Sequence, residues 1–110
     1  MRLNAKQLGA IRSVFSDAIA NRKAELYLHG SRTDDSKKGG DIDLLLLTAD
    51  TELLAELREK KFLLLVRIEA LIGEQKIDLL LASPGEAKMD PFLKNVLPSA
   101  LMIKQWEGAA

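Results

Sequence analysis

Several residue types are scarce in this chain of 110 residues, and each scarcity excludes a class of protein. There is no cysteine, which excludes disulfide scaffolds, thiolate zinc sites and cysteine nucleophiles together. The single histidine, His29, cannot build a histidine-based metal cluster. Aromatic residues make up 5% of the chain and hydrophobic residues 47%, so we expect an aliphatic core.

Neither sign of charge is in excess, since 16 Lys and Arg balance 16 Asp and Glu. Without a global basic field we expect no general nucleic-acid binding. The longest apolar runs, Leu44–Leu47 and Phe62–Val66, are far shorter than the roughly 20 residues that cross a bilayer. The first residues lack the apolar core of a secretory signal. We therefore expect a cytoplasmic protein that makes no membrane contact.

The length suits one domain, residues 1–110. Apolar periodicity and turn residues predict a helix over 5–21, a strand over 25–29, a loop over 32–40, a strand over 41–47, a long helical stretch from 50 or 51 to 72 that can break near 59–61, a strand over 76–82, a turn at 84–85, a helix over 91–96 and an edge strand over 100–106. This order predicts an α/β (α+β) protein whose mixed central sheet of about four strands carries helices on one face.

Local patterns refine this prediction. Asn4 and Gln7 fit a capping box at the start of the first helix. Leucines on both faces of the strand over 41–47 indicate a central strand, and we place the strand over 76–82 centrally as well. Within the long helical stretch, we expect one buried side, made by Leu53, Leu57, Leu64, Ile68 and Leu71. The run Leu63–Val66 is too wide for one apolar stripe, so a second chain could cover this helix.

Three acids stand at the starts of two of these strands: Asp41, Asp43 and Asp78. A buried carboxylate must be paired or must coordinate a metal. Asp41 and Asp43 share one face of their strand, with Cα atoms roughly 6.5 Å apart at about 3.3 Å per residue. Ligands that are all oxygen select a hard cation such as Mg²⁺, which shares its shell with substrate phosphates.

A small-residue turn precedes the acids. Gly30 and Ser31 follow a strand, so backbone N–H groups there can approach a phosphate without a Cβ in the way. Ser31 adds a hydroxyl donor, and Arg32, Lys37 and Lys38 add positive charge. A phosphate cradle, carboxylates for a metal and a base are the parts of a phosphoryl-transfer site. His29 could touch a nucleotide, but we expect a partly exposed residue at the end of its strand.

Two segments carry a resemblance to a known family. Leu28-His29-Gly30-Ser31-Arg32, followed by Gly40-Asp41-Ile42-Asp43-Leu44-Leu45, resembles the signature of the polymerase-β-like nucleotidyltransferase superfamily. The small size resembles that of the minimal nucleotidyltransferases (MNT), which pair with helical HEPN proteins in prokaryotic toxin–antitoxin modules. The resemblance covers roughly Leu26 through Leu81.

The resemblance implies a nucleotidyltransferase fold and an enzyme that moves a nucleoside monophosphate, AMP in the first instance, from an NTP such as ATP to a hydroxyl. It implies that Asp41, Asp43 and Asp78 are catalytic and bind Mg²⁺, with Asp78 helping to deprotonate the hydroxyl. Gly30, Ser31 and Arg32 would bind the nucleotide. The expected partner is a HEPN-type helical protein, and a homo-oligomer is a further option. The acceptor could be a protein, an RNA or a small molecule.

A second hypothesis is a nucleotide-binding antitoxin module with weak or no catalysis, which acts by forming a complex. It draws on a departure from the family pattern, because members often carry Ala-Arg-Gly where this chain has Thr33-Asp34-Asp35. Two acids beside a phosphate pocket repel a triphosphate unless they point outward or contact a cation.

Overall fold

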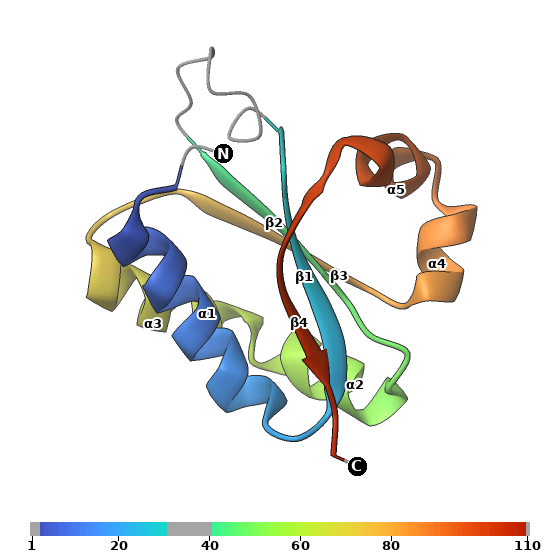
Figure 1. Cartoon of the computed structure of the whole chain (residues 1–110), viewed down its shortest axis with the longest axis horizontal. Helices are drawn as coiled ribbons and strands as arrows, with labels where there is room; N and C mark the ends of the chain where they lie inside the picture. The colour runs from blue at the N-terminus through green and yellow to red at the C-terminus, as the bar shows by residue number, and fades with distance from the viewer. Residues whose placement is uncertain (1–2, 31–40, 110) are drawn as a thin grey trace.

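Four strands form one mixed sheet with helices on both of its faces (Figure 1). The structure is a computed structural model that describes residues 3–30 and 41–109. The strands are β1 (Lys23–His29), β2 (Ile42–Leu47), β3 (Ile77–Ala82) and β4 (Leu101–Glu107). The helices are α1 (Ala5–Ile19), α2 (Thr51–Glu59), α3 (Lys61–Ile72), α4 (Pro84–Met89) and α5 (Pro91–Val96), with a short 3-10 turn, η2 (Leu97–Ser99). The predicted α+β class is confirmed, while the loop predicted over 32–40 lies outside the described residues.

The strand order is β3-β2-β1-β4, with β2 parallel to β3 and antiparallel to β1. β1 also pairs antiparallel with β4. β2 is central, as its leucines predict, and β4 is an edge strand as expected. The central position predicted for β3 is wrong, because β3 is the other edge of the sheet. The leucines of β3 nevertheless pack on both faces of the sheet. An edge strand that helices cover on both faces can therefore have the amino-acid composition of a central strand.

The larger core lies on the face of the sheet that α1, α2 and α3 cover. Ile42, Leu44 and Leu46 of β2 point into it and are fully buried. Two polar contacts attach α1 to β4: Arg12 Nε donates to the carbonyl of Ile103 at 2.9 Å, and Trp106 Nε1 donates to Ser16 Oγ at 3.0 Å. An aliphatic core of this kind is what the low aromatic content predicts.

A smaller core occupies the opposite face, so the prediction of helices on one face only is wrong. Leu45 and Leu47 of β2 and Ala82 of β3 pack there against Ala87 of α4 and Leu93 of α5. Figure 1 shows α4 and α5 on the side of the sheet away from α1 and α3. The two helices are six residues each, too short for their apolar periodicity to reveal which face they cover.

Side-chain caps begin α1 and α2. Asn4 and Gln7 form the capping box of α1, with the Gln7 N–H donating to Asn4 Oδ1 at 2.8 Å. Asp50 Oδ1 accepts the N–H of Leu53 at 3.0 Å and begins α2. The predicted break in the long helical stretch is confirmed, because Lys60 separates α2 from α3.

The turn predicted at Pro84-Gly85 is wrong, because these residues open α4. Ser83 Oγ accepts the N–H of Glu86 at 3.1 Å, and Glu86 Oε1 accepts the N–H of Ser83 at 3.0 Å. Pro84 occupies the first helical position, where its missing N–H costs nothing. Proline followed by glycine is typical of a turn, but the capping box formed by Ser83 and Glu86 decides the local structure.

One side of α3 exposes apolar side chains. Phe62 is 80% exposed, and Leu63 and Val66 are half exposed. Leu71, predicted to lie on the buried side, is 50% exposed, whereas the other four predicted leucine and isoleucine positions are buried. Within the described residues nothing covers this side of α3, and cover by a second chain stays a prediction. No helix in the same residues is long and apolar enough to cross a membrane.

Replacing Ser83 with alanine tests the cap of α4. We expect Ser83→Ala to lower the free energy of unfolding by about 1 kcal/mol, because the Glu86 N–H loses its acceptor. Urea unfolding followed by circular dichroism measures the change. Ser13→Ala, an exposed site inside α1, is the control and should cause no loss. Equal stability of Ser83→Ala and the unmodified protein would contradict the capping role.

Candidate functional site

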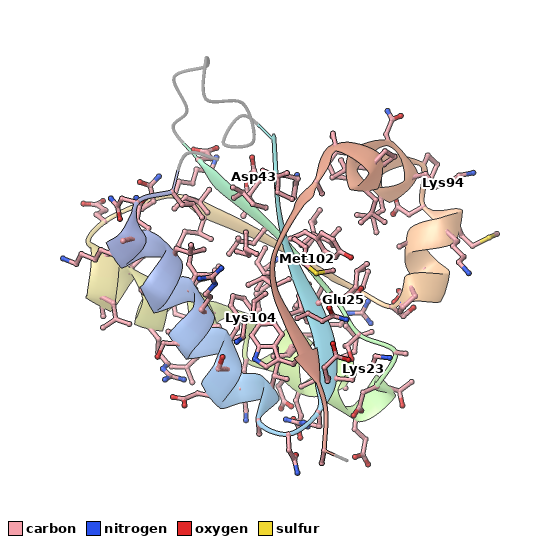
Figure 2. All side chains as sticks on the ribbon, viewed as in Figure 1. Lys23, Glu25, Asp43, Lys94, Met102 and Lys104 are labelled. Carbon is pink, nitrogen blue, oxygen red and sulfur yellow. The ribbon has the colours of Figure 1, made fainter. Side chains whose placement is uncertain are left out.

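Three polar side chains line up across one end of the sheet. β1 runs antiparallel to β2, and β3 runs parallel to β2. The last residues of β1 therefore lie beside the first residues of β2 and β3. In this register Asp43 lies opposite His29 on one side and Asp78 on the other. Neighbouring strands are about 4.8 Å apart, so the two predicted site aspartates become direct neighbours. Figure 2 shows Asp43 at this end of the sheet.

Strand alternation places these side chains on the face covered by α4 and α5. Leu45 and Leu47 point into the smaller core of that face, and Asp43 has the same parity along β2. Asp78 likewise shares its side of β3 with Leu80, which packs against the same cluster. The site therefore lies at the end of the smaller core, and the larger core lies on the opposite face of the sheet.

Asp43 carries an unfavourable negative charge. Burial raises the pKa of the Asp43 carboxyl, although His29 beside it acts in the opposite direction. The negative charges of Asp78 and Asp41, together with a hydrogen bond to Asp78, raise the pKa of Asp43 further. Two carboxyl groups that share a hydrogen bond at one end of a sheet are a typical place for a proton or a cation.

Gly30 leaves the space that the Asp43 carboxylate occupies. The backbone φ of Gly30 is +78°, a value that favours glycine. A Cβ at this position would overlap Oδ2 of Asp43. Gly30 is thus required twice, for its backbone conformation and for its lack of a side chain. The structure thus places Gly30 directly beside Asp43.

Asp41, whose charge also acts on Asp43, has a lysine as its own ion-pair partner. Its Oδ2 is 3.5 Å from Nζ of Lys76, and both side chains are well exposed, at 43% for Asp41 and 71% for Lys76. Asp41 precedes β2, and the Ile42 N–H donates to the carbonyl of Lys76 at 3.0 Å. That backbone contact brings Lys76 beside Asp41. The lysine is a neighbour that the sequence reasoning missed, since its position depends on the pairing of β2 with β3.

His29 is buried, and the expected partial exposure of this residue is wrong. The side chain is 7% exposed, and its Nε2 has no hydrogen-bond partner within the described part of the chain. Phe92 of α5 contacts it edge to face, with 6.3 Å between the ring centroids. Phe92 was not among the predicted site residues, because 62 positions separate it from Gly30 and only the fold of α5 brings it there.

Six residues were predicted for the site, and the structure describes four of them. Gly30, Asp43 and Asp78 are brought together, while Asp41 stands at the rim beside Lys76. Ser31 and Arg32, the two other predicted nucleotide-binding residues, lie outside the described residues.

The donor set can be compared with the needs of Mg²⁺. Across 3–30 and 41–109 no three histidine or acidic side chains stand close enough to hold a metal ion together. Mg²⁺ commonly binds through one or two carboxylates and takes its other ligands from water and substrate phosphates. Asp43 and Asp78 supply such a pair of carboxyl groups. Two of the three predicted metal ligands thus fit a magnesium site, and the third contacts a lysine.

Comparison with protein-family models gave no match, and a search of curated proteins found no similar sequence. The resemblance to the nucleotidyltransferase signature therefore depends on the residues of this chain alone.

Replacing Gly30 with alanine tests the close contact with Asp43. We expect Gly30→Ala to lower the free energy of unfolding by more than about 1 kcal/mol, because a Cβ is strained at this φ and overlaps the carboxylate. Gly9→Ala is the matched control: Gly9 lies inside α1 with open space around it, and alanine there should stabilise the protein by up to about 1 kcal/mol. Chemical denaturation measures both, and a neutral Gly30→Ala would refute the contact.

Replacing Asp43 with asparagine tests the raised pKa. The unfolded-state pKa of an aspartate is about 3.9, and the pKa of Asp43 is higher than this in the folded state. The free energy of unfolding therefore falls as the pH rises from the unfolded-state pKa through the folded-state pKa. We therefore expect Asp43→Asn to be more stable than the unmodified protein at pH 7 without divalent cations. This advantage should shrink as the pH falls toward 4.

Thermal unfolding between pH 4 and pH 8 in a chelating buffer measures this difference. Glu74→Gln, an exposed acid outside the site, is the control and should show no such pH-dependent gain. A destabilised Asp43→Asn at pH 7 would show that the ionised carboxylate stabilises the fold instead.

Proposed function

We propose that this protein is an Mg²⁺-dependent nucleotidyltransferase that moves a nucleoside monophosphate, AMP in the first instance, from an NTP to a hydroxyl group on a partner. The partner we propose is a HEPN-type helical protein, with this chain as the antitoxin of the pair. A cytoplasmic location belongs to the same proposal, since ATP and a co-expressed partner are both available there.

The observation that carries the proposal is the neighbouring position of Asp43 and Asp78 beside Gly30. A fold gains nothing from two adjacent carboxyl groups whose charges repel and one of which is partly buried. A cation between them removes the repulsion. A carboxyl group with a raised pKa, such as that of Asp43, is typical of functional sites. Asp43 and Asp78 also occupy positions that the resemblance assigns to metal ligands.

The residues present suit the following division of roles. Asp43 and Asp78 would hold Mg²⁺, which when bound supplies positive charge to the phosphates. Gly30, whose missing Cβ makes room for the Asp43 carboxylate, would lie beside the phosphates at the end of β1. Asp78, which is exposed, would accept the proton of the attacking hydroxyl. The oxygen of that hydroxyl forms a bond to the α-phosphorus, the bond from this phosphorus to the bridging oxygen breaks, and pyrophosphate leaves.

Transfer of labelled AMP tests the proposal. The protein is incubated with ATP labelled at the α-phosphate, Mg²⁺ and the protein encoded by the adjacent reading frame. We expect label on the partner, and a loss of about 100-fold or more in the transfer rate for Asp43→Asn and for Asp78→Asn. Gel autoradiography measures the label.

Asp17→Asn is the matched control, because Asp17 is an exposed acid of α1 that pairs with Arg67 away from the site. It should transfer label at the unmodified rate. Undiminished transfer by Asp43→Asn would remove Asp43 from the proposed mechanism, and absence of any transfer by the unmodified protein would overturn the enzymatic proposal for this partner.

The contact between Asp41 and Lys76 favours a second candidate function. In this arrangement one of the three predicted metal ligands faces a lysine instead of a shared cation. A nucleotide-binding antitoxin with little or no turnover would tolerate that contact. In a growth-rescue assay, full neutralisation of the partner by the Asp41→Asn, Asp43→Asn double variant supports this candidate, and loss of neutralisation supports the enzyme.

A further inference from the structure

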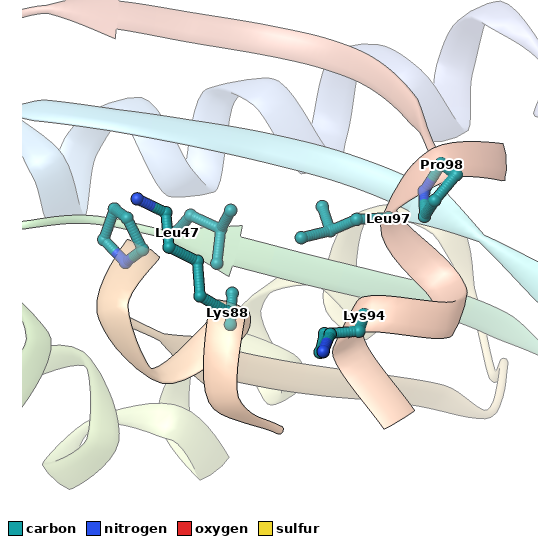
Figure 3. A pocket seen from close by; sticks show the side chains of 7 residues that line it. Leu47, Lys88, Lys94, Leu97 and Pro98 are labelled. Atoms are coloured by element: carbon teal, nitrogen blue, oxygen red, sulfur yellow. The ribbon is translucent and has the colours of Figure 1, made fainter. Parts of the chain in front are cut away.

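The face of the sheet that carries the candidate site also bears an apolar cavity, widely open to solvent, at the opposite end of β2. Its volume is about 540 Å³ (Figure 3), large enough for a small molecule. Leu47, which lies four residues after Asp43, is part of its wall. At about 3.3 Å per residue the two positions are roughly 13 Å apart, so the cavity is separate from the carboxylate pair.

The walls combine an apolar surface with two positive charges. The apolar residues are Leu47, Pro84, Ala87, Leu97 and Pro98. Lys88 from α4 and Lys94 from α5 complete the lining, so that each helix contributes one ammonium group (Figure 3).

The nearby acids already have partners. Glu86 pairs with Arg58 at 3.1 Å and accepts the N–H of Ser83. Asp90 accepts the N–H groups of Phe92 and Leu93 at the start of α5. By contrast, neither Lys88 nor Lys94 forms an ion pair with any described residue. Glu25, opposite Leu47 on β1, accepts the O–H of Tyr27. Within the described chain the two lysines of the cavity therefore have no acid as an ion-pair partner.

We propose that this cavity binds a small organic anion with an apolar body, a carboxylate or phosphate attached to an acyl or aryl group. The apolar body would contact Leu47, Ala87 and Leu97, and the anionic group would pair with Lys88 or with Lys94, whose ammonium groups lie apart in Figure 3. This site is independent of the proposed transfer reaction and requires neither a metal nor the predicted nucleotide-binding residues.

Fluorescence of 1-anilinonaphthalene-8-sulfonate, an apolar dye with one negative charge, tests the proposal on the full chain. We expect saturable binding to the folded protein and an affinity lower by about tenfold or more in the Lys88→Glu, Lys94→Glu double variant. The matched control is Lys60→Glu, Lys61→Glu, which reverses two charges beside the exposed Phe62 of α3. It should keep the unmodified affinity.

Amide chemical shifts measured by NMR locate the bound dye. Shifts at Ala87 and Leu97 on titration support the proposal, whereas shifts confined to Phe62 and Val66 place the dye on α3 and overturn it. Equal affinity of the Lys88→Glu, Lys94→Glu variant and the unmodified protein also overturns it.

Competition distinguishes the sources of the anion. Decanoate represents acyl carboxylates, and phenyl phosphate represents aryl phosphates. Displacement of the dye by either compound supports the proposal and assigns the chemical class, while displacement by neither contradicts it.

Discussion

The position of Asp43 is the constraint on which the candidate site depends. Backbone hydrogen bonding fixes His29 on one side of it and Asp78 on the other, so the side chain cannot avoid either neighbour without a shift of register. Such a shift by one residue would turn Leu44 and Leu46 out of the larger core. The core therefore enforces a pair of repelling carboxyl groups, and the absence of a Cβ at Gly30 makes the arrangement sterically allowed.

The two faces of the sheet differ in how completely helices cover them. The larger core holds most of the fully buried side chains and involves the three longest helices. The opposite face has only five residues in its buried cluster, within the described chain, and two six-residue helices. A face with this sparse cover leaves room both for the carboxyl groups at one end and for the apolar cavity at the other. Burial on the first face offsets the cost of the polar groups on the second.

Sequence patterns predicted the features that short stretches determine. The capping box of Asn4 and Gln7, the central place of β2 and the break at Lys60 all follow from neighbouring residues, and the structure confirms them. The edge position of β3 and the burial of His29 under Phe92 depend on contacts between distant segments, which no local pattern contains. The proximity of Asp43 to Asp78 was predictable, because acids at the starts of neighbouring parallel strands meet at the same end of the sheet.

Asp41 and Asp43 are two residues apart on one strand, yet their surroundings differ. Asp43 lies beside a second carboxyl group, whereas Asp41 lies beside a lysine. An exposed ion pair of this type contributes about 0–1 kcal/mol. The enzyme that we propose would have to break this pair to use Asp41 as a metal ligand, whereas the binding module would keep it. At Asp43 and Asp78 a bound cation would relieve repulsion between carboxyl groups instead of breaking an ion pair. Under the proposed function these two residues would therefore bind the cation before Asp41.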